Sequence, residues 1–187
     1  FKITGKNLMI NRAAESLFSG QVNSLIMLVI VIFLIMSFLF TSPIAGLISL
    51  VPNLIPVVFC FGVMGLFGIP LNPGTATVAA IAVGIAIDDT IHLMTRYGEN
   101  CRIEPDQYKA SLLTIRGEAV PVISTSISLA CGFATLLLSD FNIVLQFGVL
   151  AASTMIFALL SDLLVAPLLL RFVRLAGMWE ILAMKVN

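Results

Sequence analysis

Long runs of apolar residues, separated by short polar or turn-forming stretches, dominate the pattern of this chain. A helix that crosses the hydrocarbon core of a bilayer needs about 20 mostly apolar residues. The pattern predicts five such helices, at Val22–Phe40, Ile44–Ile69, Thr75–Tyr97, Val120–Ser139 and Ile143–Val173. We therefore expect an all-α fold, an integral membrane bundle of five transmembrane helices.

The connections between the runs are mostly tight. "TSP" after Phe40, "PLNPG" around Asn72 and "SDFN" around Asp140 contain the residues that favour turns, so their flanking helices are antiparallel neighbours. Only residues 98–117 form a long, charged connection, for which a short surface helix is one alternative. Inside the second run, Pro52 and Pro56 predict a kink.

The distribution of basic residues predicts the orientation. Lysines and arginines concentrate in the 98–117 connection and after the last helix, and five spans place these two regions on the same side. The positive-inside rule assigns that side to the cytoplasm, with the N-terminal segment outside. We expect residues 1–21 to be the tail of an extracytoplasmic segment, 22–174 the membrane domain and 175–187 a cytoplasmic tail. The whole chain is expected to be a fragment, a truncated gene product or one piece of an assembly.

Composition supports the membrane assignment and excludes other classes. Hydrophobic residues make up 59% of the 187 residues and charged residues 11%, with a mean hydropathy of +1.10. Soluble domains are nearer half apolar and a quarter charged. The net charge is zero, which gives no indication of nucleic-acid binding. The three cysteines are scattered without metal or redox spacing, so we expect no metal and no cofactor.

Two adjacent carboxylates, Asp88 and Asp89, interrupt the third apolar run in "AVGIAIDDTIHLMTRY". Insertion of an aspartate at a helix centre costs about 2.5–3.5 kcal/mol, so the pair faces protein or water and not lipid. Adjacent carboxyl groups titrate as a coupled unit, which suits a proton carrier. The alternative is a structural polar cluster, satisfied by hydrogen bonds from Thr90 and from polar residues of other helices.

Helical spacing places Ala80, Gly84, Asp88 and His92 on one face of this helix, with Asp89 about 100° away. The small residues on this face favour the close approach of another helix. His92 is the only histidine of the chain, and a role in a proton relay and a simple interfacial position remain equally open.

Other polar residues lie in the apolar runs. Asp162 in the fifth run either meets the pair or marks the point where the helix leaves the bilayer. Asn53 lies between the two prolines, where satisfying the kinked backbone is its expected role and serving as a polar partner of the acids is the alternative. The serines and threonine of "STSIS" (124–128) bond either across helices or to their own backbone. Because no Lys or Arg lies in mid-membrane, the carboxylates find no basic partner in these runs.

These motifs together resemble the C-terminal membrane half of a resistance–nodulation–division (RND) exporter. The likeness is greatest to the MMPL branch, whose membrane domain is of the sterol-sensing type and which is related to Patched-like proteins. "SLVPNLIPVVFCFGVMGLFGIPLN" is similar to a helix of that family. "AVGIAIDDTIHLMTRY" is similar to its Gly-x-x-x-Asp-Asp helix, at Gly84, Asp88 and Asp89. "GEAVPVISTSISLACGFATLLLSDF" and "FGVLAASTMIFALLSDLLVAPLLL" are similar to its last two helices.

The resemblance implies proton-driven efflux of a hydrophobic or amphiphilic substrate across a bacterial inner membrane, with protons as the coupling ion. Asp88 and Asp89 would form the proton relay, supported by Gly84, Thr90, His92 and Asp162. The family has two membrane halves and two large extracytoplasmic porter loops. The resemblance therefore implies an N-terminal membrane half and porter domains as partners, on this chain or another.

The sequence leaves two other functions as alternatives. A sterol- or lipid-sensing module would use the same fold without moving protons. An intramembrane aspartyl protease would need two aspartates on different helices, for which Asp88 and Asp162 are the candidates. The context "GIAIDD" does not match the Gly-x-Gly-Asp motif of such proteases, so we expect no enzyme activity.

Overall fold

The computed structural model describes residues 6–170, with side chains described for 11–13, 15–72 and 74–170. Five helices are long and apolar enough to cross a membrane, which confirms the predicted fold class. The helices are α1 (Lys6–Leu39), α2 (Pro43–Phe67), α3 (Pro73–Ile103), α4 (Gln107–Ala134) and α5 (Asn142–Leu160). A 3₁₀ turn η1 (Thr135–Leu138) ends α4, and a π-helical turn η2 (Ser161–Val165) joins α5 to the short α6 (Ala166–Leu170).

The turns form where the sequence supplies caps. The Ser42 hydroxyl accepts the Ala45 N–H at the start of α2, where Pro43 occupies the first helical position. Asn72 and Thr75 exchange hydrogen bonds in a capping box at the start of α3. Gly68 ends α2 at φ +63°, a left-handed conformation that glycine adopts without a steric penalty.

Helix boundaries depart from the prediction outside the apolar runs. α1 begins at Lys6 and not at Val22, so its 34 residues extend for about 51 Å. Most of the charged connection 98–117 is helical, as the ends of α3 and α4, and only Glu104–Asp106 separate them. Hydropathy finds only the part of a helix that lies in lipid. The expected end of the fifth helix at Val173 and the tail 175–187 lie outside the described residues.

Polar bonds tie the charged ends of α3 and α4 together. The Asn100 amide donates to the Thr114 hydroxyl at 2.9 Å. The Arg96 guanidinium lies 2.9 Å from the Glu99 carboxylate on its own helix and 3.7 Å from the Glu118 carboxylate on α4. These contacts therefore stabilise the end of α3 and the beginning of α4, which extend beyond the predicted membrane spans.

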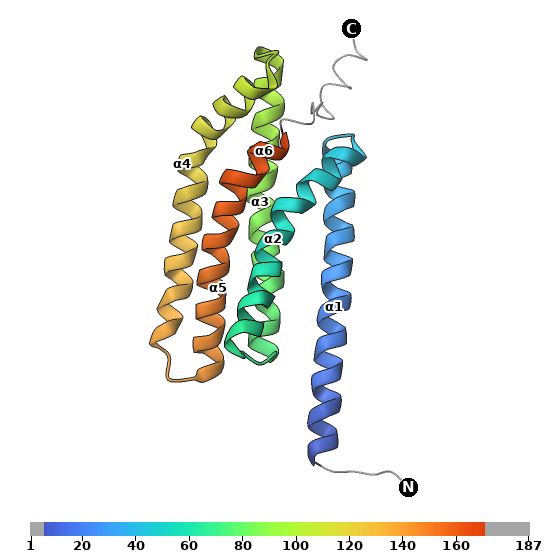
Figure 1. Cartoon of the computed structure of the whole chain (residues 1–187), viewed down its shortest axis with the longest axis vertical. Coiled ribbons are helices and arrows are strands. Elements are labelled where there is room, and N and C mark those ends of the chain that lie inside the picture. Colours follow the sequence, from blue (N-terminus) through green and yellow to red (C-terminus); the bar gives the residue numbers. More distant parts are fainter. Residues whose placement is uncertain (1–5, 171–187) are drawn as a thin grey trace.

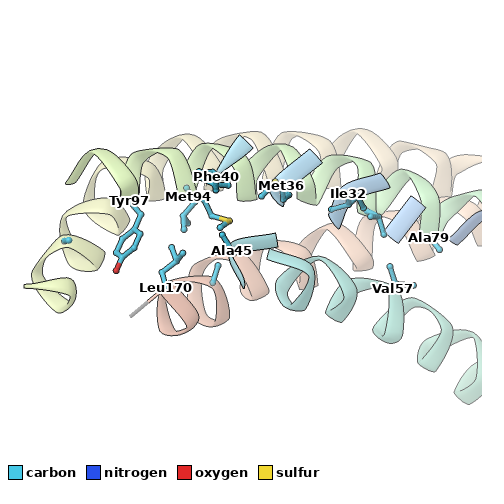
Figure 2. Close-up of a cluster of buried hydrophobic side chains, with 13 residues drawn as sticks. Ile32, Met36, Phe40, Ala45, Val57, Ala79, Met94, Tyr97 and Leu170 are labelled. Carbon is cyan, nitrogen blue, oxygen red and sulfur yellow. The ribbon is translucent and has the colours of Figure 1, made fainter. Parts of the chain in front are cut away.

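α3 occupies the middle of the bundle, where it packs against α2, α4 and α5 (Figure 1). α1 stands at one side and packs mainly on α2 (Figure 1). The largest buried cluster joins α1, α2, α3, α4 and α6; Figure 2 labels nine of its members, among them Met36, Ala45, Tyr97 and Leu170. The beginning of α2 is inclined to the rest of that helix, which contains Pro52 and Pro56 (Figure 1).

Helix α5 approaches the end of α4 and η1 closely at Gly148. A Cβ at this position would lie 2.8 Å from the Leu136 Cβ, a distance that real Cβ atoms essentially never show, and 3.0 Å from the Phe133 carbonyl oxygen, which is tighter than most real contacts. The neighbouring Phe133 and Phe147 rings pack edge to face with centroids 5.9 Å apart. The absence of a side chain at Gly148 therefore sets the separation of these helices.

We expect Gly148→Ala to destabilise the bundle by about 1–3 kcal/mol, because the methyl group overpacks the contact of α5 with the end of α4 and with η1. Gly132→Ala is the matched control, since a Cβ there meets nothing within 4 Å. It should be neutral or stabilise helix α4 by up to about 1 kcal/mol. Thermal unfolding in detergent compares the two, and equal stability of both variants would contradict the packing assignment.

Candidate functional site

The two adjacent aspartates of α3 point in different directions. The Asp88 side chain is 77% exposed, whereas Asp89 is half-buried and faces α4. Their separation follows from the 100° rotation per residue of an α-helix. The two carboxyl groups remain close enough for their charges to interact. One acid therefore lies on the outside of this chain and the other lies towards its interior.

The outer face of α3 carries Gly84, Asp88 and His92, as the spacing predicted. The His92 Nε2 lies 3.8 Å from the Asp88 Oδ1, and the imidazole is 68% exposed. The expectation of close helix packing at Gly84 is not met within the described residues, because a Cβ there would meet nothing within 4 Å. The small-residue face exists, but no helix of residues 6–170 covers it.

Asp89 meets helix α4 through Ser126. The Ser126 hydroxyl donates to the Asp89 Oδ2 at 3.5 Å, a long hydrogen bond. The other hydroxyls of "STSIS" bond locally, with Ser124 and Thr125 donating to the Pro121 carbonyl and Ser128 to the Ser124 carbonyl. This run therefore bonds in both of the expected ways: Ser126 bonds to another helix, and Ser124, Thr125 and Ser128 bond to the backbone of their own helix.

Asp162 lies in the centre of the bundle and is fully buried, with 0% exposure. The Thr90 hydroxyl lies 3.3 Å from its Oδ1, while its Oδ2 has no hydrogen-bond partner among the described residues. Its charge also interacts with that of Asp89. Asp162 thus lies inside the bundle against α3, on the side of Asp89 and away from the exposed Asp88.

The π-helical turn η2 places Asp162 there. The Ala166 N–H bonds to the Ser161 carbonyl, five residues back, and not to the carbonyl four residues back. Pro167 follows directly and has no N–H to donate, which weakens regular α-helical bonding across this turn. That proline was the signal in the sequence that could have revealed the distortion.

Asn53 of α2 completes the buried cluster. Its side-chain nitrogen donates to the Ser49 carbonyl at 2.6 Å, an oxygen that can only accept. The Asn53 Oδ1 therefore points the other way, where it lies 3.3 Å from the Thr90 hydroxyl. The Asn53 side chain thus bonds to the backbone of its own helix beside the kink and also contacts α3, so it acts as a partner of both kinds.

Ser161 of η2 bonds to the backbone of α2. Pro56 has no N–H, so the carbonyl of Pro52, four residues earlier, lacks its usual helical donor. The buried Ser161 hydroxyl supplies this donor at 2.9 Å. Sequence reasoning missed both Ser161 and the central position of Thr90, because neither residue type is unusual in a membrane helix.

The cluster has the chemistry of proton binding and hydrogen bonding. In the part of the chain that the structure describes, Asp89 and Asp162 form no ion pair with a Lys or Arg. Residues 6–170 bring together no group of three or more His, Cys, Asp or Glu suited to a metal ion. Asp88 lies on the exposed side of α3 and Asp162 in the interior, so the dyad considered for a protease does not assemble.

Comparison with known proteins shows the family to which this chain belongs. The model of the MMPL family matches residues 1–185. The chain belongs to the MMPL family, within the RND superfamily. It is thus a multi-pass membrane protein, as five apolar helices and family membership both indicate.

Relatives of this MMPL-family chain occur in distant organisms. A membrane protein of Methanocaldococcus jannaschii is 31% identical over 139 residues, 74% of this chain and 36% of that protein. The membrane protein ActII-3 of Streptomyces coelicolor is 24% identical over 173 residues, covering 90% of this chain and 24% of that protein. Protein patched homolog 1 of Danio rerio is 30% identical over 145 residues, 74% of this chain and 11% of its own length. The chain thus spans little more than a third of these relatives at most.

We expect Ser161→Ala to destabilise the bundle by about 1–2 kcal/mol, because it leaves the Pro52 carbonyl without a donor in the bundle interior. Ser153→Ala is the matched control, since the Ser153 hydroxyl donates only to the Leu150 carbonyl of its own helix. Unfolding of both variants in detergent measures the difference. Equal stabilities would show that the Ser161 bond does not hold α2 against η2.

Proposed function

We propose that this chain is the membrane part of a proton-coupled exporter of hydrophobic or amphiphilic substrates, with Asp88 and Asp89 as its proton relay. The observation that carries the proposal is a pair of carboxyl groups inside a membrane helix, which form no ion pair with a Lys or Arg among the described residues. An intramembrane acid in this situation is functional by default, because burial without a role is costly. Membership of the MMPL family is consistent with an RND-type transporter.

The relay uses the different directions of the two acids. A proton that passes from Asp88 to Asp89 moves from the outer face of α3 to the interior, where Ser126 and Asp162 lie. His92 lies 3.8 Å from Asp88 and serves as the neighbouring proton acceptor on the outer face. Asp162 and Thr90 support the relay from inside the bundle.

The exposed face of α3 is the proposed contact with a second membrane half. Leaving Asp88 in lipid would cost about 2.5–3.5 kcal/mol, and Gly84 beside it lets a partner helix approach closely. The proposed assembly also includes porter domains outside a bacterial inner membrane, on the side of the N-terminus, with the C-terminus in the cytoplasm. This orientation rests on the basic residues at the α3–α4 connection.

The available energy is sufficient for such a cycle. One elementary charge crossing 100 mV is worth ~2.3 kcal/mol. One pH unit adds about 1.4 kcal/mol. A proton or two per cycle therefore shifts a two-state helix arrangement by a factor of ten or more.

We expect the carboxyl C=O infrared band of the lipid-reconstituted chain to titrate between about pH 6 and 8, the range in which a carrier must gain and lose its proton. Asp88→Asn and Asp89→Asn should each remove part of this band, since each variant deletes one member of the coupled pair. Asp140→Asn is the control, because Asp140 lies in the turn between η1 and α5. A titration unchanged in both relay variants would refute the proposed relay.

A second candidate function, lipid binding without transport, is favoured by a cavity between α1 and the end of α2. The cavity has a volume of about 340 Å³, an almost wholly apolar lining, and Gln21, Met64 and Gly65 among its walls. The Gln21 side-chain nitrogen is buried without a hydrogen-bond partner in the described residues. An apolar cavity with one free donor suits an amphiphile that has a single hydroxyl or carbonyl group, such as a sterol.

We expect Gly65→Phe to fill this cavity and reduce photocrosslinking of a diazirine sterol to α2 at least fivefold. Gly62→Phe is the matched control, because Gly62 lies on the same helix, is equally open and does not line the cavity. Mass spectrometry of the crosslinked peptides gives the measurement. If both variants crosslink as strongly as the unmodified chain, the cavity is not a sterol site.

A further inference from the structure

The Thr90 hydroxyl lies between two acceptors that compete for its one hydrogen. Its oxygen is 3.3 Å from the Asn53 Oδ1 and 3.3 Å from the Asp162 Oδ1. All three residues are at most 1% exposed. A hydroxyl can donate only one hydrogen bond at a time, although it can accept others.

The number of donors decides the protonation of the cluster. If Asp162 is ionised, Thr90 can donate either to Asp162 or to Asn53, and the other acceptor has no donor. The Asp162 Oδ2 has no partner in either case among the described residues. An ionised carboxylate buried with at most one hydrogen bond and no opposite charge is strongly unfavourable.

A protonated Asp162 satisfies both 3.3 Å contacts of the Thr90 oxygen at once. The acid O–H on Oδ1 donates to the Thr90 oxygen, and the Thr90 O–H donates to the Asn53 Oδ1. When the proton leaves for a carboxylate of the relay, the Thr90 hydrogen turns to Asp162, and Asn53 loses its donor. The same three side chains thus support two hydrogen-bond directions without a change of position.

The hydrogen bonds that link Asp162, Thr90 and Asn53 end at the part of α2 where backbone hydrogen bonds are missing. Asn53 is between Pro52 and Pro56, where the helix lacks two backbone donors. Two bonds hold this turn to its neighbours, the Thr90 bond to Asn53 and the Ser161 bond to the Pro52 carbonyl. Ser161 is the residue before Asp162, so both bonds depend on the same polar cluster.

We propose that Asp162 is a proton-carrying residue of the relay, and that the Thr90 hydroxyl transmits its protonation state to the kink of α2. In the protonated state Thr90 holds Asn53, and the beginning of α2 is fixed against α3. In the ionised state that bond is lost and the beginning of α2 is free to change its inclination. This inference rests on the proposed function and adds the step that converts a proton into helix movement.

The charges that face Asp162 are few. From α3 the charge of Asp89 acts on it, with Asp88 and His92 acting in turn on Asp89. Helix α2 contains no charged residue, and Asp162 is the only one from Asn142 to Leu170. On α4 the neighbour of the acids is the neutral Ser126. Coupling to Asp89 is therefore the main electrostatic influence on the switch.

The test combines infrared spectroscopy with spin-label distances on the lipid-reconstituted chain. One label pair joins Leu47, before the α2 kink, to Leu113 on α4, and both side chains are exposed. The control pair joins Leu66, after the kink, to Leu138 at the other end of the bundle, also exposed. The accessible cysteines Cys101 and Cys131 are replaced by serine in all samples.

We expect the Leu47–Leu113 distance to change with pH and the Leu66–Leu138 distance to stay constant. Asp162→Asn should remove one carboxylic-acid band and abolish the pH response of the first distance, because its amide is a permanent donor like the protonated acid. Thr90→Val should keep the acid band, shifted to higher frequency by the lost hydrogen bond, but abolish the distance change. Thr90→Ser keeps the hydroxyl and should restore it.

The outcomes separate this inference from the proposed function. If Thr90→Val retains the pH-dependent distance, or no band is lost in Asp162→Asn, the switch is refuted while a titrating Asp88–Asp89 band still supports the relay. If Na⁺ removes the Asp162 band at constant pH, the site holds a cation and the proton assignment is overturned. If no carboxyl group titrates, both the switch and the relay fail.

Discussion

Hydrocarbon offers no hydrogen-bond partner, and this constraint shapes every polar feature of the bundle. Each donor or acceptor inside the spans must be satisfied by another part of the protein. The caps at Ser42 and Asn72 meet this demand at the helix ends. In the interior it is met in part by the contacts among Asn53, Thr90 and Asp162, which join α2, α3 and η2, while the Asp162 Oδ2 has no partner among the described residues.

Two irregularities of the backbone face each other in this interior. The prolines of α2 remove N–H donors, and the π-helical turn before α6 turns a serine and an aspartate inward. Each irregularity alone would leave unsatisfied groups in a membrane. Together they are complementary, because Ser161 supplies the donor that the Pro52 carbonyl lacks. Such paired defects create polar contacts between helices that are otherwise apolar, and they are less rigid than regular helices.

The sequence predicted the five helices because a run of about 20 apolar residues matches the thickness of a bilayer and is rare in soluble domains. It did not predict which face of α3 points inward, since apolar residues surround this helix and give its rotation no clear signal. The sequence therefore presents Asp88 and Asp89 as an equivalent pair, although one is exposed and the other half-buried. The importance of Thr90 was also hidden, because it depends on Asn53 and Asp162, which are 37 and 72 residues away. Contacts of this kind come from packing and leave no local pattern.

The length of α1 has a mechanical consequence. Its 34 residues form a rod of about 51 Å, so about 20 Å projects beyond a hydrocarbon core of about 30 Å. The rod packs mainly on α2 and leaves most of its surface uncovered. If it pivots by about 10° at the α1–α2 turn, its far tip sweeps sideways by about 9 Å, within the tilt range of spanning helices. α1 therefore has the geometry of a lever arm, in which a small change of angle inside the bilayer would give a large displacement outside it.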